Sequence, residues 1–393
     1  MTTIRLHLPS IPHTITRDDY SHCAFTGKVQ RFSPMMRSIG YEVYHYGVET
    51  SDSGANTQID LFSLHEWNEL RVQSFKKLFP ELSDIDIQKR IHDPTQFIGD
   101  LGHIDTPLYV EFNRRFRESL LKHYRSKSTD IICIPFGHAY SSALDGLDVV
   151  SVESGIGYLN AYSTFRIYES YAFMHHDYSH IQDTEIQYYW FVCPNYYNSV
   201  EWPLQLNPDP STVGFLGRIQ NDKGLYIIVE LARRFKNTTF IICGQGDPMP
   251  YLIEPNIIYK KPIHATERGI YLSNLSALIA PSRFLEPFCG VSVEAQLCGT
   301  PVISSDYGAF VENIEQFKTG VRCRTLSDFC YGVQMALDKR FDRQYIHNRA
   351  ITLFDMYNVA KKYKYAFDSI MDIFNGTNGW YSPDTHIDNL NKE

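Results

Sequence analysis

Short runs of β-branched and aromatic residues alternate along the chain with longer segments of helical periodicity. The runs predict strands at residues 4–8, 41–46, 130–135, 149–152, 212–216, 238–243, 256–259, 277–280 and 301–304. Apolar residues spaced three and four apart predict helices between them, for example at 224–235 and 291–297. Strands and helices in alternation form right-handed βαβ units, so we expect an α/β protein built on parallel sheets.

The alternation pauses at residues 193–211, where four prolines interrupt a stretch with little periodicity. We interpret this stretch as a linker between two doubly wound parallel-sheet domains, 1–205 and 206–356. The last segment, 357–393, is predicted to contain a helix and a polar tail, and to pack back on the first domain. Open parallel sheets bind ligands beyond the carboxyl ends of their strands, so two facing domains form a cleft there.

The composition restricts the class of protein. The chain has 393 residues, of which 43% are hydrophobic and 21% charged, as in globular proteins, and its net charge is −8. A general nucleic-acid binder is usually basic, so that class is disfavoured. We expect no membrane span, because no apolar run approaches about 20 residues, and no signal peptide. The eight cysteines contain no C-x-x-C pair, which favours reduced thiols and a cytoplasmic protein.

Residues 107–127 predict one amphipathic helix with a basic side. Its buried stripe is predicted from four apolar residues spaced by four positions: Leu108, Phe112, Phe116 and Leu120. Six cations occupy the rest of the segment: Arg114, Arg115, Arg117, Lys122, Arg125 and Lys127. This side is either a solvated surface or a face for an anionic partner.

Two cations surround a glycine turn after the strand predicted at 212–216. In GFLGRIQNDKG the strand ends at Gly217 and Arg218, and a helix starts after Lys223 and Gly224. We expect Arg218 and Lys223 to lie at the carboxyl edge of the sheet. Cations and the free amides of a helix start suit a diphosphate at that place.

Two glutamates frame a second turn, in RFLEPFCGVSVEAQLCGTPVISSD. Pro287 and Gly290 interrupt the chain between Glu286 and Glu294, and a helix is predicted to start near Val291. Glu286 is therefore expected in a loop and Glu294 in the first part of the helix. Carboxylates in these places can each bind two hydroxyls of a sugar or ribose, beside amides that can bind an anion. The alternative is one capping and one surface glutamate.

These motifs, in this order, resemble glycosyltransferase family 4. The resemblance extends over residues 212–340 and includes G-R-x4-K-G, G-x-G-D at 244–247, E-P-F-C-G-V-S-V-E-A and C-G-T-P-V-I-S-S-D. It implies the GT-B architecture, in which two Rossmann-like domains face each other across a cleft, and a retaining sugar transfer. The residues that it assigns to donor binding are Gly217, Arg218, Lys223, Gly244, Phe288, Cys289, Gly290, Val291 and Glu294.

The same resemblance implies individual roles. Arg218 and Lys223 hold the donor diphosphate, Glu286 faces the transferred sugar and Glu294 binds the ribose, so that Glu286, Lys223 and Arg218 form the expected catalytic set. Cys289 stands where the family often has a small or polar residue. The expected donor is a nucleotide-diphosphate sugar, most commonly a UDP-sugar, with no further cofactor. A GT-B nucleotide-sugar epimerase and a non-catalytic binding subunit are the alternatives.

The first domain resembles the family more loosely. Gly27, in SHCAFTGKVQRF, allows the backbone to approach donor phosphate or acceptor closely. His138 in IPFGHAY and Glu153 in VVSVESGIGY are each expected just past a strand end, on the acceptor side. Several segments also resemble glycosyltransferases of bacteriophage and large-virus genomes. The expected acceptor is therefore a glycan, a lipid-linked glycan or a hydroxymethylated base in DNA, and the oligomeric state is open.

A histidine-rich segment at 175–180 is not expected to bind a metal. Adjacent His175 and His176 cannot both face one site on a helix, and the H-x4-H spacing to His180 differs from the H-x3-H of helical zinc sites. The sequence also contains no P-loop and no G-x-S-x-G motif, which disfavours ATP-driven chemistry and a hydrolase triad.

Overall fold

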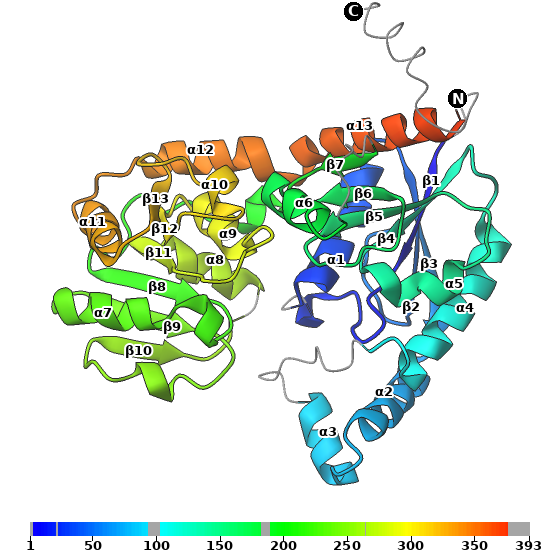
Figure 1. The fold of residues 1–393 in the computed structure, drawn as a ribbon, viewed down its shortest axis with the longest axis horizontal. Helices are drawn as coiled ribbons and strands as arrows, with labels where there is room; N and C mark the ends of the chain where they lie inside the picture. Colours follow the sequence, from blue (N-terminus) through cyan, green and yellow to red (C-terminus); the bar gives the residue numbers. More distant parts are fainter. Residues whose placement is uncertain (1–2, 21–22, 93–102, 182–188, 264, 376–393) are drawn as a thin grey trace, which may run out of the picture.

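The computed structural model describes residues 3–20, 23–92, 103–181, 189–263 and 265–375. These residues form two α/β domains, each built on one parallel sheet (Figure 1). The sheet in the first domain has the order β3-β2-β1-β4-β5-β6-β7, and the sheet in the second has the order β10-β9-β8-β11-β12-β13. The α/β fold with two doubly wound parallel sheets that the sequence predicts is confirmed.

The first sheet contains seven strands among the described residues, with β1 beside both β2 and β4. Its strands are β1 (Arg5–Pro9), β2 (Glu42–Val48), β3 (Thr57–Phe62), β4 (Asp130–Ile134), β5 (Ser151–Ile156), β6 (Phe165–Tyr168) and β7 (Trp190–Val192). Its helices are α1 (Ala24–Arg37), α2 (Leu64–Leu78), α3 (Asp84–His92), α4 (Pro107–His123), α5 (Ser141–Leu144) and α6 (Tyr171–Tyr178).

The second sheet places β8 between β9 and β11. Its strands are β8 (Thr212–Leu216), β9 (Thr239–Cys243), β10 (Ile257–Lys260), β11 (Ala277–Ala280), β12 (Val302–Ser305) and β13 (Gly320–Cys323). Its helices are α7 (Tyr226–Arg234), α8 (Ala265–Ser273), α9 (Gly290–Leu297), α10 (Phe310–Asn313), α11 (Leu326–Leu337) and α12 (Arg343–Phe354). The strand order reverses between β8 and β11, which is where open sheets of this kind bind ligands.

Most differences from the predicted elements concern short or polar strands. The pattern did not predict β3, β6, β7 or β13, because these strands have only three to six residues, and β3, β6 and β13 include charged or polar positions. The strand predicted at 149–152 instead begins at residue 151 and runs to 156. The amphipathic helix predicted at 107–127 is confirmed as α4, although it ends at His123. Its predicted apolar stripe is fully buried, at 0% exposure for Leu108, Phe112, Phe116 and Leu120.

The chain crosses between the domains twice, and the two crossings are bonded to each other. After β7 it passes to the second domain through Tyr197, and after α12 it returns through Asp355. The amide of Tyr197 donates to the carbonyl of Phe354 at 2.9 Å, and the amide of Met356 donates to the carbonyl of Tyr197 at 2.8 Å. The two crossings are therefore held to each other by a short stretch of paired backbone.

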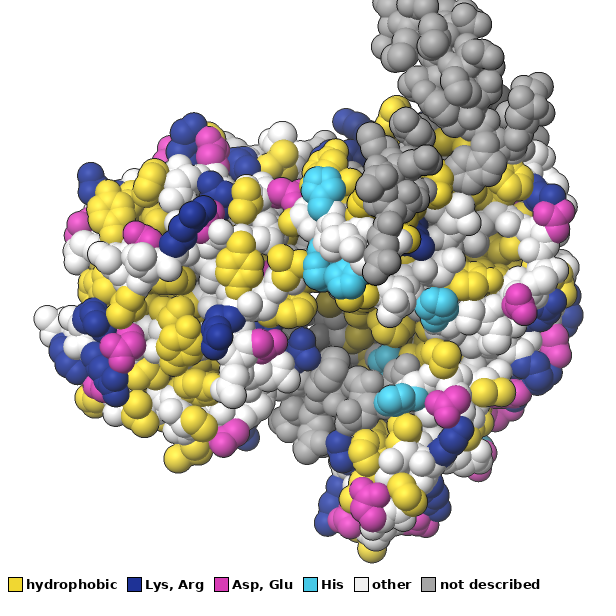
Figure 2. Space-filling model, viewed as in Figure 1, with side chains coloured by type: hydrophobic (Ala, Val, Ile, Leu, Met, Phe, Trp, Pro, Cys, Tyr) yellow, Lys and Arg dark blue, Asp and Glu magenta, His cyan; other side chains and the backbone are white. Residues whose placement is uncertain are grey.

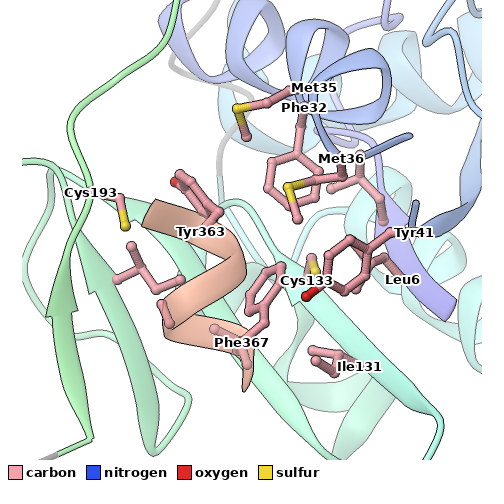
Figure 3. Close-up of a cluster of buried hydrophobic side chains, with 14 of the residues drawn as sticks. Leu6, Phe32, Met35, Met36, Tyr41, Ile131, Cys133, Cys193, Tyr363 and Phe367 are labelled. Carbon is pink, nitrogen blue, oxygen red and sulfur yellow. The ribbon is translucent and has the colours of Figure 1, made fainter. Parts of the chain in front are cut away.

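The returning chain forms α13 (Met356–Asn375), which packs on the first domain. Helices α12 and α13 run nearly end to end across both domains in Figure 1. Tyr363 and Phe367 of α13 point toward Phe32 of α1 and Leu6 of β1, and all four side chains are buried (Figure 3). Helix α13 thus completes the core of the first domain, whereas the tail predicted at 376–393 lies outside the described residues.

We expect Phe367→Ala to lower the free energy of unfolding of the first domain by about 3–5 kcal/mol, because it leaves a cavity in a close-packed core. Phe367 is 0% exposed and packs edge-on against Tyr41 and Phe32. Tyr365→Ala on the same helix is the matched control, since Tyr365 is 70% exposed. Urea unfolding of both variants gives the comparison, and equal losses of stability would contradict the packing of α13 described above.

Candidate functional site

A cleft of about 1040 Å³ lies between the two domains, and side chains from both of them line it. In Figure 2 the domains stand side by side with a depression between them. The second domain contributes residues from the loops after β8 and β11 and from the start of α9: Arg218, Lys223, Glu286, Phe288, Cys289, Gly290, Val291 and Glu294. The first domain contributes Gly27, Lys28, Gly157 and Glu169, among others. The donor residues expected from the sequence are thus brought together at one cleft, most of them on its walls.

Glycines bring the loops of the second domain close together. A Cβ at Gly244 would lie 1.7 Å from the carbonyl oxygen of Gly217, so the turns after β8 and β9 approach each other in a way that only glycine permits. Gly224 has φ +69°, and a Cβ there would lie 2.1 Å from the carbonyl oxygen of Pro281. Both contacts fix the segment 217–224, which carries Arg218 and Lys223, against the neighbouring loops.

Lys223 and Glu286 form an ion pair at the wall of the cleft. The Lys223 Nζ lies 2.6 Å from Glu286 Oε1, and the Ser282 hydroxyl donates to the same oxygen at 2.7 Å. The two charged side chains are only 15% and 11% exposed. The amide of Arg283 also donates to the carbonyl of Asp222 at 2.7 Å, which joins the two loops through their backbones. Glu286 therefore lies in the loop expected for it, with a cation and a hydroxyl on one oxygen.

Helix α9 begins at Gly290 and points its first turn into the cleft. Cys289, which precedes it, has the left-handed φ of 61° that ordinary side chains rarely adopt. Burial raises the pKa of the Cys289 thiol well above its usual value, and the nearby Glu286 carboxylate raises it further. The amides of a first helical turn have no partners within the helix, so this turn can bind an anion.

Glu294 pairs with a residue that the sequence analysis did not single out. Its carboxylate is bonded to the guanidinium of Arg268, from α8, and the Glu294 side chain is 10% exposed. Arg268 also lines the cleft. Nothing in the local sequence distinguishes Arg268 from surface arginines such as Arg233, because the pairing arises only when α8 and α9 pack together.

On the first domain, a buried ion pair faces the same cleft. Lys28 of α1 is bonded to the carboxylate of Glu169, and both side chains are less than 10% exposed. The Lys28 Nζ also donates to the carbonyl of Gly155 at 2.6 Å and lies 4.4 Å from the centre of the Phe25 ring. Gly27, which the sequence predicts to lie at the site, precedes Lys28 in α1 and lines the cleft. The sequence analysis missed Lys28 and Glu169.

The expected position of Glu153 past a strand end is wrong, whereas that of His138 is confirmed. Glu153 lies inside β5 instead of past its end, is 0% exposed, and accepts hydrogen bonds from the Tyr158 hydroxyl at 2.6 Å and the Tyr162 amide at 2.7 Å. Burial raises the pKa of this carboxyl. His138 follows β4 as expected, but it is exposed and lies against the Tyr162 ring. Neither residue is among the described residues that line the cleft.

The histidine-rich segment is the end of α6. Asp177 there is engaged by the Tyr168 hydroxyl at 2.6 Å and by Arg166 at 3.1 Å. Within the described ranges, no group of three or more His, Cys, Asp or Glu side chains is placed to hold a metal ion. The helices in the same ranges also include none that is long and apolar enough to cross a membrane.

The chain is similar to a known protein family, to individual sequences and to solved structures. Residues 199–329 match the family described as Glycosyl transferases group 1. Glycogen synthase of Mycobacterium tuberculosis is 27% identical over 164 residues, which are 37% of this chain and 39% of that protein. D-inositol 3-phosphate glycosyltransferase of Paenarthrobacter aurescens is 28% identical over 132 residues, 30% of this chain and 32% of that one. The matched segment spans about two-fifths or less of these relatives.

Solved structures resemble the whole described fold. One is AviGT4, a glycosyltransferase involved in avilamycin A biosynthesis. The match covers 94% of this chain and 98% of AviGT4, with a TM-score of 0.61 and 14% sequence identity. Another is Anabaena HepE, solved in complex with UDP and glucose. The match covers 94% of this chain and 100% of HepE, with a TM-score of 0.60 and 15% sequence identity. The chain therefore has the GT-B fold.

Proposed function

We propose that this protein is a retaining glycosyltransferase that moves a sugar from a UDP-sugar to an acceptor hydroxyl in the cleft between its domains. The observation that carries the proposal is the convergence of Arg218, Lys223, Glu286 and Glu294 around the start of α9. The group 1 match includes all four residues. UDP is bound in the solved HepE neighbour, which favours UDP as the nucleotide.

The diphosphate of the donor binds between Arg218, Lys223 and the first amides of α9. Both cations and the helix start lie at the strand-order reversal of the second sheet, on one wall of the cleft. Negative charge develops on the departing diphosphate when its bond to the sugar breaks. Preorganised cations and amides stabilise that charge, and such stabilisation is usually the largest contribution to catalysis.

The two carboxylates hold the hydroxyls of the donor. Glu286 shares Lys223 with the incoming diphosphate, because its carboxylate lies 2.6 Å from the Lys223 ammonium. A phosphate that takes this ammonium group leaves the Glu286 carboxylate available to the hydroxyls of the transferred sugar. Glu294, further along α9, is placed for the ribose and is oriented by Arg268. The resemblance of residues 212–340 to retaining enzymes, in which the acceptor approaches the face that the diphosphate leaves, supports the retention that we propose.

The acceptor binds on the first domain, over Gly27 and the Lys28–Glu169 pair, and we propose a glycan rather than DNA. The basic side of α4 is already compensated, because Arg114 pairs with Glu111 and Glu118. Arg115 likewise pairs with Glu111 and Glu66. A phosphate backbone gains affinity from cations that release counterions, and ion-paired arginines offer little of this.

We place the reaction in the cytoplasm. All eight cysteines are free, and five of them are buried: Cys133, Cys193, Cys243, Cys298 and Cys323. Unpaired thiols in this number are typical of a reducing compartment.

The proposal is tested first by UDP release from a panel of UDP-sugars, with and without glycan acceptors. Lys223→Ala and Arg218→Ala should each lower kcat/KM by about 10²–10³-fold, the effect of removing one preorganised group that stabilises a developing anion. Lys236→Ala is the matched control, because Lys236 is an exposed cation that pairs with Glu254 outside the cleft. Unchanged turnover in the Lys223→Ala, Arg218→Ala double variant would contradict the assignment of the donor site.

The two carboxylates should differ kinetically. Glu294→Ala should raise KM for the donor with little change in kcat, because ribose contacts are equal in the ground and transition states. Glu286→Gln should mainly lower kcat, because contacts to the reacting sugar strengthen as charge develops. Steady-state kinetics of both variants with one UDP-sugar separate these effects. A change in KM alone for both variants would mean that the two roles are assigned wrongly.

The left-handed backbone at Cys289 should control UDP binding. Cys289→Val places a β-branched side chain at φ 61°, so we expect the turn to shift and UDP affinity to fall by about tenfold or more. Cys289→Gly permits the same φ and should keep the affinity within about twofold. Calorimetric titration with UDP measures both. Equal affinities of the two variants would show that the backbone of this turn does not bind the nucleotide.

A further inference from the structure

Four consecutive residues that follow β6 connect the Lys28–Glu169 pair of the first domain to the second domain. They are Glu169, Ser170, Tyr171 and Ala172, and the last two begin α6, which lies at the junction of the domains in Figure 1. Glu169 holds Lys28 within the first domain. The following three residues all contact the second domain, so this segment is where the acceptor side meets the donor side.

Ser170 contacts the loop that bears Glu286. Its hydroxyl donates to the carbonyl oxygen of Pro287 at 2.6 Å and accepts from the amide of Phe173 at 3.1 Å. Ser170 therefore caps α6 and binds the other domain with a single oxygen, and its side chain is buried. Because Pro287 directly follows Glu286, this hydrogen bond ends one residue from the carboxylate proposed to face the sugar.

Glu312 makes the second contact, from α10 of the other domain. Its carboxylate accepts from the amide of Tyr171 at 3.0 Å and from the amide of Ala172 at 2.8 Å. These amides belong to the first turn of α6, where no partner exists within the helix, and a negative charge there is favoured by the helix dipole. A side chain of the second domain thus completes the cap of a helix of the first.

The two contacts are made to parts of the second domain that are hydrogen-bonded to each other. The side-chain amide of Asn313, next to Glu312, donates to the carbonyl of Phe288 at 2.5 Å. The amide of Ala309 donates to the carbonyl of Glu286 at 3.2 Å. Helix α10 and the loop at 286–288 are therefore bonded to each other, and the first domain holds this unit at two adjacent points.

We propose that Ser170 and Glu312 are positioning residues, which fix the loop bearing Glu286 against the first domain and so set the place of its carboxylate in the cleft. This role rests on the proposed function. The cations that bind the diphosphate belong to the second domain alone. Loss of either contact therefore leaves UDP binding intact and impairs only the step that needs both domains together.

The test compares Ser170→Ala and Glu312→Ala with the unmodified protein. We expect UDP affinity within about twofold, measured by titration calorimetry. UDP release is measured with the donor that is hydrolysed fastest among UDP-glucose, UDP-galactose and UDP-N-acetylglucosamine. Its kcat should fall by about three- to tenfold, the effect of losing one ordinary hydrogen bond. Ser170→Thr keeps the hydroxyl and should restore kcat. Val311→Ala is the control on α10, since Val311 is 51% exposed.

Hydrogen exchange gives a second measurement that does not depend on turnover. A peptide over residues 168–176 should exchange more slowly in the unmodified protein than in Glu312→Ala, because the amides of Tyr171 and Ala172 lose their acceptor. Unchanged kcat in both variants, equal exchange, or a matching loss of UDP affinity would overturn the positioning role. Failure of the unmodified protein to bind UDP would instead contradict the proposed function.

Discussion

The geometry of the cleft depends on the backbone bridge between the two chain crossings. Tyr197 and Asp355 lie opposite each other in this bridge, and each crossing bonds to the other within a few residues. The Tyr197 side chain extends from the bridge into the core of the second domain and reaches the start of α9, where a Cβ at Gly290 would lie 2.8 Å from its hydroxyl. The side chain of Tyr197 therefore connects the bridge between the domains to the proposed phosphate-binding turn.

Six charged side chains that line the cleft are arranged in three neutral pairs. Lys223 faces Glu286, Arg268 faces Glu294, and Lys28 faces Glu169. A charge removed from water is costly unless an opposite charge compensates it, so the pairs allow six charged side chains to remain largely buried. An anionic ligand changes this balance, because it competes for the cations and releases the carboxylates. The ion pairs therefore compensate the buried charges in the folded protein, and a diphosphate can still replace the carboxylates as the partner of the cations.

Much of the second domain could be predicted from the sequence, for a physical reason. Its strands β8 and β11 are buried on both faces and are predicted from apolar runs, and the site residues follow those runs directly. The site residues of the first domain were harder to predict, because Lys28 and Glu169 are 141 positions apart and neither belongs to a local pattern. Glu153 was misplaced because a charged residue usually ends a buried strand. Here β5 continues through it, since the Tyr158 hydroxyl and two backbone amides satisfy the carboxylate.

The packing of α13 has a consequence for how the protein is made. The core of the first domain includes Val359, Tyr363, Phe367 and Ile370, which the ribosome adds only after the whole second domain. During synthesis the first domain therefore emerges with an unfilled apolar groove on its surface. Its folding cannot finish in the usual order, from the N-terminal domain onward. The apolar side chains that α13 covers therefore stay exposed until this helix has been synthesised and packs against them.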